Sequence, residues 1–119
     1  MPLSLLLVDD SPVSRMMLRR VLPPADFEIE EVSSGRECLD RYREKRADLV
    51  FLDLTMPGLS GFDTLAQLKK LDPQVKVVVL TADVQAKSLA LALELGALEV
   101  IRKPPRAEDI RSAMERFLP

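Results

Sequence analysis

The sequence predicts an α/β fold, a five-stranded parallel sheet with five helices covering both of its faces. Two observations predict it. Five short apolar segments alternate with five amphipathic ones, and the connections between them are short. Residues 49–52 are continuously apolar and residues 75–80 are apolar except for Lys76, which is typical of strands buried on both faces. This alternation implies right-handed crossovers, and the flavodoxin-like strand order 2-1-3-4-5 is the natural candidate at this size.

The first βα unit begins with an apolar strand at residues 3–8, which leads directly into two aspartates. Ser11 is expected to cap a helix at residues 13–22, with Pro12 in its first turn. We assign the core-facing stripe of this helix to its apolar side chains at helical spacing: Val13, Met16, Met17, Leu18 and Val21.

The rest of the chain continues the alternation. Residues 27–32 alternate apolar and charged side chains, as in a half-exposed edge strand. Gly96 is expected to end the fourth helix, because glycine tolerates the left-handed conformation that follows many helices. The remaining strands are expected at 49–52, 75–80 and 98–101, and the remaining helices at 36–45, 62–71, 84–95 and 107–118.

Composition limits the functions that this chain can have. Its 119 residues suffice for one domain, 1–119, and the absence of histidine excludes a histidine triad, a histidine metal site and a phosphohistidine carrier. A net charge of −2 offers no basic surface for nucleic acid. The lone Cys38 forms no internal disulfide and suggests a reducing compartment. Without a signal peptide or an apolar run of membrane length, we expect a cytoplasmic protein that does not bind membranes.

Polar residues follow four strands that are neighbours in the expected order: Asp9 and Asp10, Asp53, Thr81 and Lys103. Three close carboxylates repel each other unless a cation intervenes, and ligands that are all oxygen suit Mg²⁺. A carboxylate nucleophile can accept a phosphoryl group, whose transfer needs a metal, a cationic side chain and a hydroxyl. Turn formation, helix capping and solvation are the ordinary roles of such residues. Their coincidence at four strand ends favours a site over those roles.

These motifs resemble a known family. Residues 7–11 (LVDDS), 52–61 (LDLTMPGLSG), 80–82 (LTA), 96–97 (GA) and 103–104 (KP) are similar to those of the receiver domain of two-component response regulators. The resemblance covers essentially the whole chain, and the combination of motifs is highly specific. It implies a phospho-accepting signalling switch rather than an enzyme, with a histidine kinase as phosphodonor.

The resemblance also implies roles for individual residues. Asp53 corresponds to the phospho-acceptor, Asp9 and Asp10 to the further metal carboxylates, and the Thr55 carbonyl to another Mg²⁺ ligand. The Lys103–Pro104 peptide is expected to be cis, as is typical of the family.

A second group of residues corresponds to the family's conformational switch. Thr81 corresponds to its switch hydroxyl and Lys103 to its phosphoryl partner. Thr55 and Asp83 occupy variable positions that tune the lifetime of the phosphoryl group. Val100 departs from the pattern, because family members often carry Tyr or Phe three residues before the lysine. The aromatic half of the switch is therefore missing.

The helix expected at residues 84–95 carries more leucine than one buried face requires. We assign its core-facing stripe to Ala86, Ala90, Leu93 and Ala97. The other apolar side chains then form a candidate partner surface for a downstream protein or for self-association: Leu89, Leu91, Leu95 and Val100. Burial of these leucines by neighbouring loops is the alternative.

Three functional classes remain open. The chain is a stand-alone receiver of the chemotaxis type, or the N-terminal receiver of a longer regulator or hybrid kinase, or an enzyme or flavin binder on a similar fold. A phosphatase of the haloacid dehalogenase type would have a second Asp where Thr55 stands. In a flavodoxin, the phosphate would face repulsion from Asp9 and Asp10.

Overall fold

A computed structural model describes residues 2–55, 58, 60–83 and 85–119. Met56, Pro57 and Leu59 of the predicted loop, and Val84 at the predicted start of the fourth helix, lie outside the described residues. The described elements follow in this order: β1 (Leu3–Val8), α1 (Pro12–Val21), β2 (Phe27–Val32), α2 (Gly35–Glu44), β3 (Leu49–Asp53), α3 (Gly61–Leu71), β4 (Val77–Thr81), α4 (Ala86–Glu94), β5 (Glu99–Arg102) and α5 (Ala107–Phe117).

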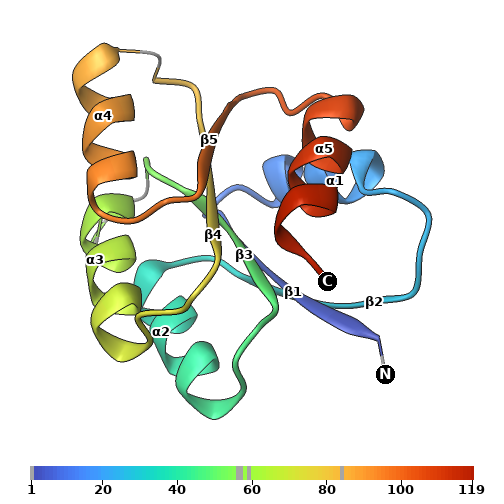
Figure 1. Cartoon of the computed structure of the whole chain (residues 1–119), viewed down its shortest axis with the longest axis horizontal. Coiled ribbons are helices and arrows are strands. Elements are labelled where there is room, and N and C mark those ends of the chain that lie inside the picture. Colours follow the sequence, from blue (N-terminus) through green and yellow to red (C-terminus); the bar gives the residue numbers. More distant parts are fainter. Residues whose placement is uncertain (1, 56–57, 59, 84) are drawn as a thin grey trace.

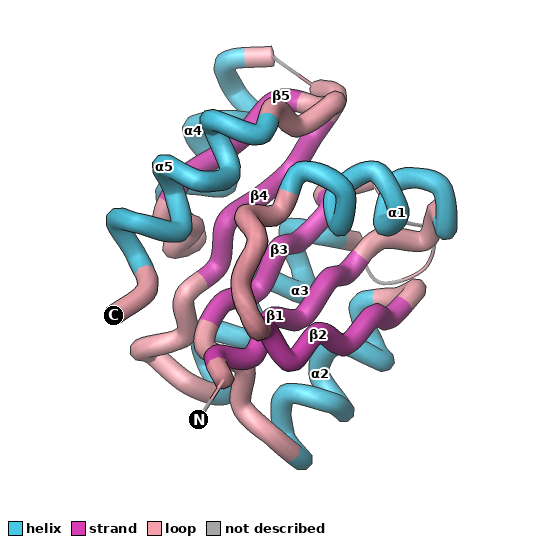
Figure 2. The backbone as a smooth tube through the Cα atoms, turned by 90° about the vertical axis from the view of Figure 1, so that its right-hand side faces the viewer, coloured by secondary structure: helices cyan, strands magenta, loops and turns pink. Residues whose placement is uncertain are grey.

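The strands form a parallel sheet in the order β2-β1-β3-β4-β5, which confirms the predicted fold class and topology. Helices α1 and α5 lie on one face of the sheet, and α2, α3 and α4 lie on the other (Figure 1 and Figure 2). Among the described residues, no helix has the length and apolar character needed to cross a lipid bilayer.

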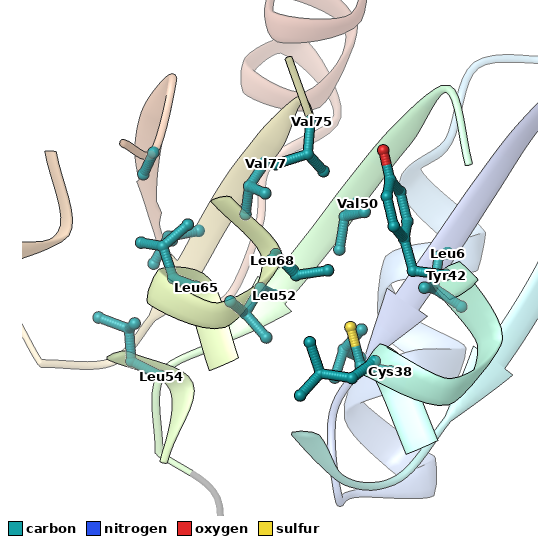
Figure 3. Close-up of a cluster of buried hydrophobic side chains, with 14 of the residues drawn as sticks. Leu6, Cys38, Tyr42, Val50, Leu52, Leu54, Leu65, Leu68, Val75 and Val77 are labelled. Atoms are coloured by element: carbon teal, nitrogen blue, oxygen red, sulfur yellow. The ribbon is translucent and has the colours of Figure 1, made fainter. Parts of the chain in front are cut away.

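The core consists of two layers separated by the sheet. Successive strand residues point to opposite faces, so Leu6 and Val50 pack against α2 and α3, whereas Leu5 and Leu49 pack towards α1 and α5. Figure 3 shows the first layer, in which the ring of Tyr42 and the sulfur of Cys38 lie among aliphatic side chains. Because both of their faces are covered, β3 and β4 are apolar up to their last residues, Asp53 and Thr81.

Three helices begin at a serine that accepts a hydrogen bond from a backbone amide in the first turn. Ser11 caps α1 as predicted, Ser34 caps α2 and Ser60 caps α3. Each cap satisfies an amide that the helix itself leaves unpaired. At Ser11 and Ser60 the cap also fixes where the helix begins after β1 and β3, close to the carboxyl ends of those strands.

The predicted core stripe of α1 is wrong at three positions. Val13, Met16 and Met17 are exposed, at 60%, 45% and 41%, whereas Leu18 is buried. The physical reason is Arg15, whose guanidinium turns inward to hydrogen bond with the Asp9 carbonyl and to pair with Glu31. Because Arg15 faces inward, α1 is rotated so that fewer of its apolar side chains face the sheet. Val21 is half-buried and packs at the margin of the core layer.

The predicted core stripe of α4 is also wrong. Ala86, Ala90 and Leu93 are exposed, whereas Ala92 is fully buried. Alanine and leucine occur on every side of this helix, so hydrophobicity alone does not set its rotation. The small Ala92 side chain takes the position closest to the sheet, and Ala97, beyond the end of the helix, is buried as predicted.

Candidate functional site

Three of the predicted site residues emerge on one face of the sheet. Asp9, Asp53 and Lys103 each lie two residues beyond a strand side chain that packs towards α1 and α5. Those preceding side chains are Leu7, Phe51 and Ile101. The alternation of strand side chains therefore directs the two carboxylates and the ammonium to the same side of the sheet edge.

Lys103 lies between the two carboxylates. Its Nζ is 2.7 Å from Asp9 Oδ2 and 3.4 Å from Asp53 Oδ1. Its backbone N–H donates to the Thr81 carbonyl at 2.9 Å, and its peptide bond to Pro104 is cis, as predicted. The Lys103 ammonium thus forms ion pairs with two carboxylates, which follow or end the neighbouring strands β1 and β3.

Asp53 is buried, with 3% of its surface exposed. Burial raises the pKa of this carboxyl above its usual range, and the neighbouring Asp9 carboxylate raises it further, while Lys103 acts in the opposite direction. Thr55 approaches Asp53 Oδ1 with its N–H at 3.3 Å and its hydroxyl at 3.2 Å. The hydrogen bonds from Thr55 therefore hold the Asp53 carboxylate in place, while Lys103 neutralises its charge only in part.

The carboxylates form a set of oxygen donors suited to a hard divalent cation. Asp9, Asp10 and Asp53 each offer one oxygen, and these oxygens lie within 4.8 Å of one another. Asp10 is exposed and leaves the cluster open to solvent. Because the raised pKa of Asp53 reflects its burial and the Asp9 charge, a cation here would relieve the repulsion. The residues present fit Mg²⁺.

The loop after β4 begins with a chain of short polar contacts. The buried Thr81 hydroxyl accepts the Asp83 N–H at 3.0 Å. Asp83 in turn accepts Ser88 Oγ at 2.6 Å and the Gln85 N–H at 2.9 Å. These two hydrogen bonds lower the pKa of Asp83, the Ser88 bond most strongly. The end of β4 is therefore tied directly to the first turn of α4.

Sequence reasoning missed three supports of this site. Arg15 binds the Asp9 carbonyl, Ser88 holds Asp83, and Gly61 packs against the β3 end. The spacing of Ser88, five residues beyond Asp83, could have suggested the link to α4. An arginine on a helix gives no comparable signal, because such residues are usually solvated.

Gly61 lets helix α3 start directly against the strand that carries Asp53. A Cβ at this position would lie 2.5 Å from the Asp53 carbonyl oxygen and 2.4 Å from Leu54 Cα. The Gly61 N–H also donates to the Leu54 carbonyl at 3.2 Å. Any side chain larger than hydrogen therefore forces the backbone next to Asp53 to move.

We expect Gly61→Ala to lower the free energy of unfolding by about 1–3 kcal/mol, the usual cost of overpacking. The clash involves backbone atoms, which cannot rotate away as a flexible side chain would. Urea unfolding followed by circular dichroism measures the change. A variant as stable as the original protein would show that the strand and helix can separate without cost.

The predicted partner surface is only partly exposed. Leu91 has 39% of its surface exposed, whereas Leu89 is half-buried. Leu95 and Val100 are half-buried as well and pack against the core layer beneath α4. Leu91 is thus the member of this set most accessible to a partner.

Comparison with known proteins places this geometry in a family. A family model described as the response regulator receiver domain matches residues 5–115. The chemotaxis protein CheY of Thermotoga maritima is 34% identical over 93% of each chain. A putative response regulator from Chloroflexus aurantiacus has a similar structure, with a TM-score of 0.92 and 26% identity over 99% of this chain and 98% of that one.

A third relative is known in a complex. The crystal structure of the CheX–CheY–BeF3–Mg²⁺ complex from Borrelia burgdorferi matches with a TM-score of 0.90 and 26% identity, over 100% of this chain and 92% of that one. The family model matches nearly the whole chain, and the TM-scores show that these structures share its fold. The chain belongs to the response regulator receiver domain family.

Proposed function

We propose that Asp53 accepts a phosphoryl group from a histidine kinase in the presence of Mg²⁺, and that this changes the surface offered to a protein partner. One observation carries the proposal: a buried carboxylate at the end of β3 lies beside two further carboxylates and 3.4 Å from a lysine ammonium. Few arrangements other than phosphoryl transfer to a carboxylate need all of these groups together.

The chemistry assigns a role to each side chain. An Asp53 oxygen attacks phosphorus, the bond from phosphorus to the donor breaks, and an acyl phosphate forms on Asp53. Lys103 already contacts Asp53, and it neutralises charge on the transferred oxygens. Asp9, Asp10, Asp53 and the Thr55 carbonyl would hold Mg²⁺. The bound ion would supply further positive charge and orient the phosphoryl oxygens. The protein assists its own phosphorylation and dephosphorylation without turning over a separate substrate.

Thr81 carries the change to α4. A phosphoryl oxygen accepts a hydrogen bond from the Thr81 hydroxyl and draws Thr81 towards Asp53, while the oxygen of that hydroxyl accepts the Asp83 N–H at 3.0 Å in the present state. Movement of Thr81 therefore loosens Asp83, which Ser88 connects to α4. With valine at position 100, no aromatic side chain follows this movement, so the readout depends on the backbone of the loop. Thr55 and Asp83 flank the path of the attacking water and tune the phosphoryl lifetime.

The partner is a protein, and nucleic acid is not expected to bind this domain. The CheY of Borrelia burgdorferi forms a complex with CheX in the presence of BeF3 and Mg²⁺, which supports a protein target for a receiver of this shape. The contact surface in this chain centres on the exposed Leu91 of α4. The half-buried Leu89, Leu95 and Val100, on α4, at its C-terminal end and on β5, form its edge.

The direct test uses acetyl phosphate as a small phosphodonor together with Mg²⁺. Intact-mass spectrometry measures the incorporation of one phosphoryl group, and peptide mapping locates it. Incorporation at Asp53 supports the proposal. Incorporation at another carboxylate, or none at all, contradicts it.

Leu91→Glu tests the partner surface. Because Leu91 is 39% exposed, we expect the free energy of unfolding to change by no more than about 0.5 kcal/mol, and labelling at Asp53 to continue. The introduced charge should weaken binding of the phosphorylated protein to its partner, or its self-association, because a glutamate at an apolar contact loses its hydration. Sedimentation velocity of labelled protein measures self-association.

Met16→Glu is the matched control, since Met16 is similarly exposed on α1, on the opposite face of the sheet. It should leave the association unchanged. A large loss of stability in Leu91→Glu would place Leu91 in the core and remove it from the partner surface.

A further inference from the structure

A cavity of about 310 Å³ lies beneath the site, between α1 and the loop that follows β5. Its inner end touches Leu7, Phe51 and Leu80, which are almost fully buried and belong to the side chains that face α1 and α5. These residues belong to the layer just inside Asp9 and Asp53. The cavity therefore ends against the core on one side and at Asp9 and Lys103 on the other.

Short side chains keep this space open. Ser14 and Ala82 line its rim, and Pro104 and Pro105 form the opposite wall. None of these four side chains reaches far from its backbone. Met17 also lines the pocket and is 41% exposed, so this flexible apolar side chain does not fill the space. The described structure thus leaves a largely apolar pocket, partly open to solvent, at the surface of the packed core.

The charges around the cavity decide what kind of molecule it suits. Its polar end is the Asp9–Lys103 ion pair at 2.7 Å, whose ammonium also lies 3.4 Å from Asp53. An anionic ligand would face Asp9 and the nearby Asp53, and a cationic one would face Lys103 and Arg15. An organic ion in the pocket would have to displace one partner of that pair or leave its own charge unpaired in a partly buried place, which is costly, whereas Mg²⁺ can approach the carboxylates from the open side at Asp10. A neutral ligand leaves the pair intact.

The volume sets the size of that ligand. An engineered apolar cavity of roughly 150 Å³ holds one benzene ring. A space of about 310 Å³ is twice as large and falls at the lower end of natural small-molecule sites. It matches a flat molecule of two fused rings.

We infer that this cavity, between α1 and the Lys103–Pro105 loop, is a binding site for a neutral, largely apolar molecule of about two rings. The ring system lies between Met17 and the Pro104–Pro105 segment, with one edge against the aliphatic part of Lys103 and the inner edge towards Leu7, Phe51 and Leu80. The site shares only Asp9 and Lys103 with the phosphorylation site, and binding requires neither metal nor a phosphoryl group.

Indole is a suitable probe, and the 119-residue chain is tested without phosphodonor and with chelator present. Backbone amide NMR spectra recorded during titration should show saturable shifts at Leu7, Phe51 and Leu80, with a dissociation constant of about 1 mM or tighter. Because no phosphorylation is involved, a failure here is separate from a failure of the proposed function. No shift up to the solubility limit of indole overturns the inference.

Ser14→Leu fills the cavity from α1, where leucine suits a helix, and should weaken indole binding by about tenfold or more. Ser112→Leu places the same change on the exposed side of α5, outside the cavity, and should leave binding unchanged. Equal binding by both variants overturns the inference, since indole would then bind elsewhere.

Met17→Trp provides a second block from an exposed position, should Ser14→Leu fail to fold. Its indole side chain should occupy the cavity, and added indole should then cause no saturable shift at Phe51. Unchanged binding in Met17→Trp overturns the inference. The inference is also overturned if the original chain is a dimer and Ser14→Leu converts it to a monomer, because a second copy of the chain would then occupy the cavity.

Discussion

Asp53→Asn should abolish phosphate incorporation from acetyl phosphate. The asparagine amide carries no negative charge and is a poor nucleophile towards phosphorus, and the other carboxylates lack the same surroundings. Asp10 is exposed, and Asp9 is held by Lys103 at 2.7 Å and by the Ser11 N–H at 2.9 Å. Intact-mass spectrometry after incubation with Mg²⁺ measures the loss.

The same variant should be more stable than the original protein when no metal is present. Burial and the Asp9 charge raise the pKa of Asp53, so the ionised carboxylate destabilises the fold. This destabilisation is present above the raised pKa and disappears as the pH falls towards the ordinary value of an aspartate. The difference in melting temperature between the two proteins should therefore be largest near neutral pH and shrink in acid.

Asp40→Asn is the matched control, because Asp40 is an exposed carboxylate on α2, paired only with Arg43 among the described contacts. It should label fully and show no gain in stability. If Asp53→Asn labels as well as Asp40→Asn, the acceptor is another residue, and the assignment of the site is wrong.

The sheet could be predicted from the sequence because its signals are local. Residues 49–52 are apolar without interruption, and a strand of that kind must be buried on both faces. The ends of the elements differ by one or two residues from those predicted: β4 begins at Val77 instead of Val75, and α4 at Ala86 instead of Val84. The strand order cannot be derived from the pattern of apolar residues within each strand, because it depends on how the connecting helices pack on the sheet.

The rotation of the helices could not be predicted in the same way. In α1, the apolar side chains Val13, Met16 and Met17 face solvent because Arg15 occupies the inward position. The spacing of apolar residues gives no sign that an arginine will hydrogen bond to a backbone carbonyl outside its own helix. In α4, the buried Ala92 is chosen by its small size at a close helix–sheet contact.

The candidate site was easier to predict than the surfaces around it. Each charged residue follows an apolar strand, so topology alone brings Asp9, Asp53 and Lys103 to one edge. The contact between Gly61 and the backbone of Asp53 and Leu54 is different in kind. It depends on how closely the backbone of α3 approaches the end of β3, and this distance can be known only from the folded structure.

Mg²⁺ should be required for labelling and should also stabilise the unphosphorylated protein. The oxygens of Asp9, Asp10 and Asp53 lie within 4.8 Å of one another, and Lys103 is the cation that contacts two of these carboxylates in the described structure. Binding to the folded state alone adds about 2.7 kcal/mol at a hundred times the dissociation constant. Melting curves with Mg²⁺ or with chelator, at matched ionic strength, measure the gain.

Asp10→Asn separates metal binding from general screening. Asp10 is exposed, so its replacement should barely change stability without metal, yet it removes one oxygen ligand and its charge. Affinity for Mg²⁺ should fall by about tenfold or more, since even outer-shell partners matter that much at metal sites. Asp40→Asn removes an equal charge on α2 and should keep the full response. Equal stabilisation of both variants by Mg²⁺ would mean that the ion acts by screening, and the strand-end carboxylates would then not be its site.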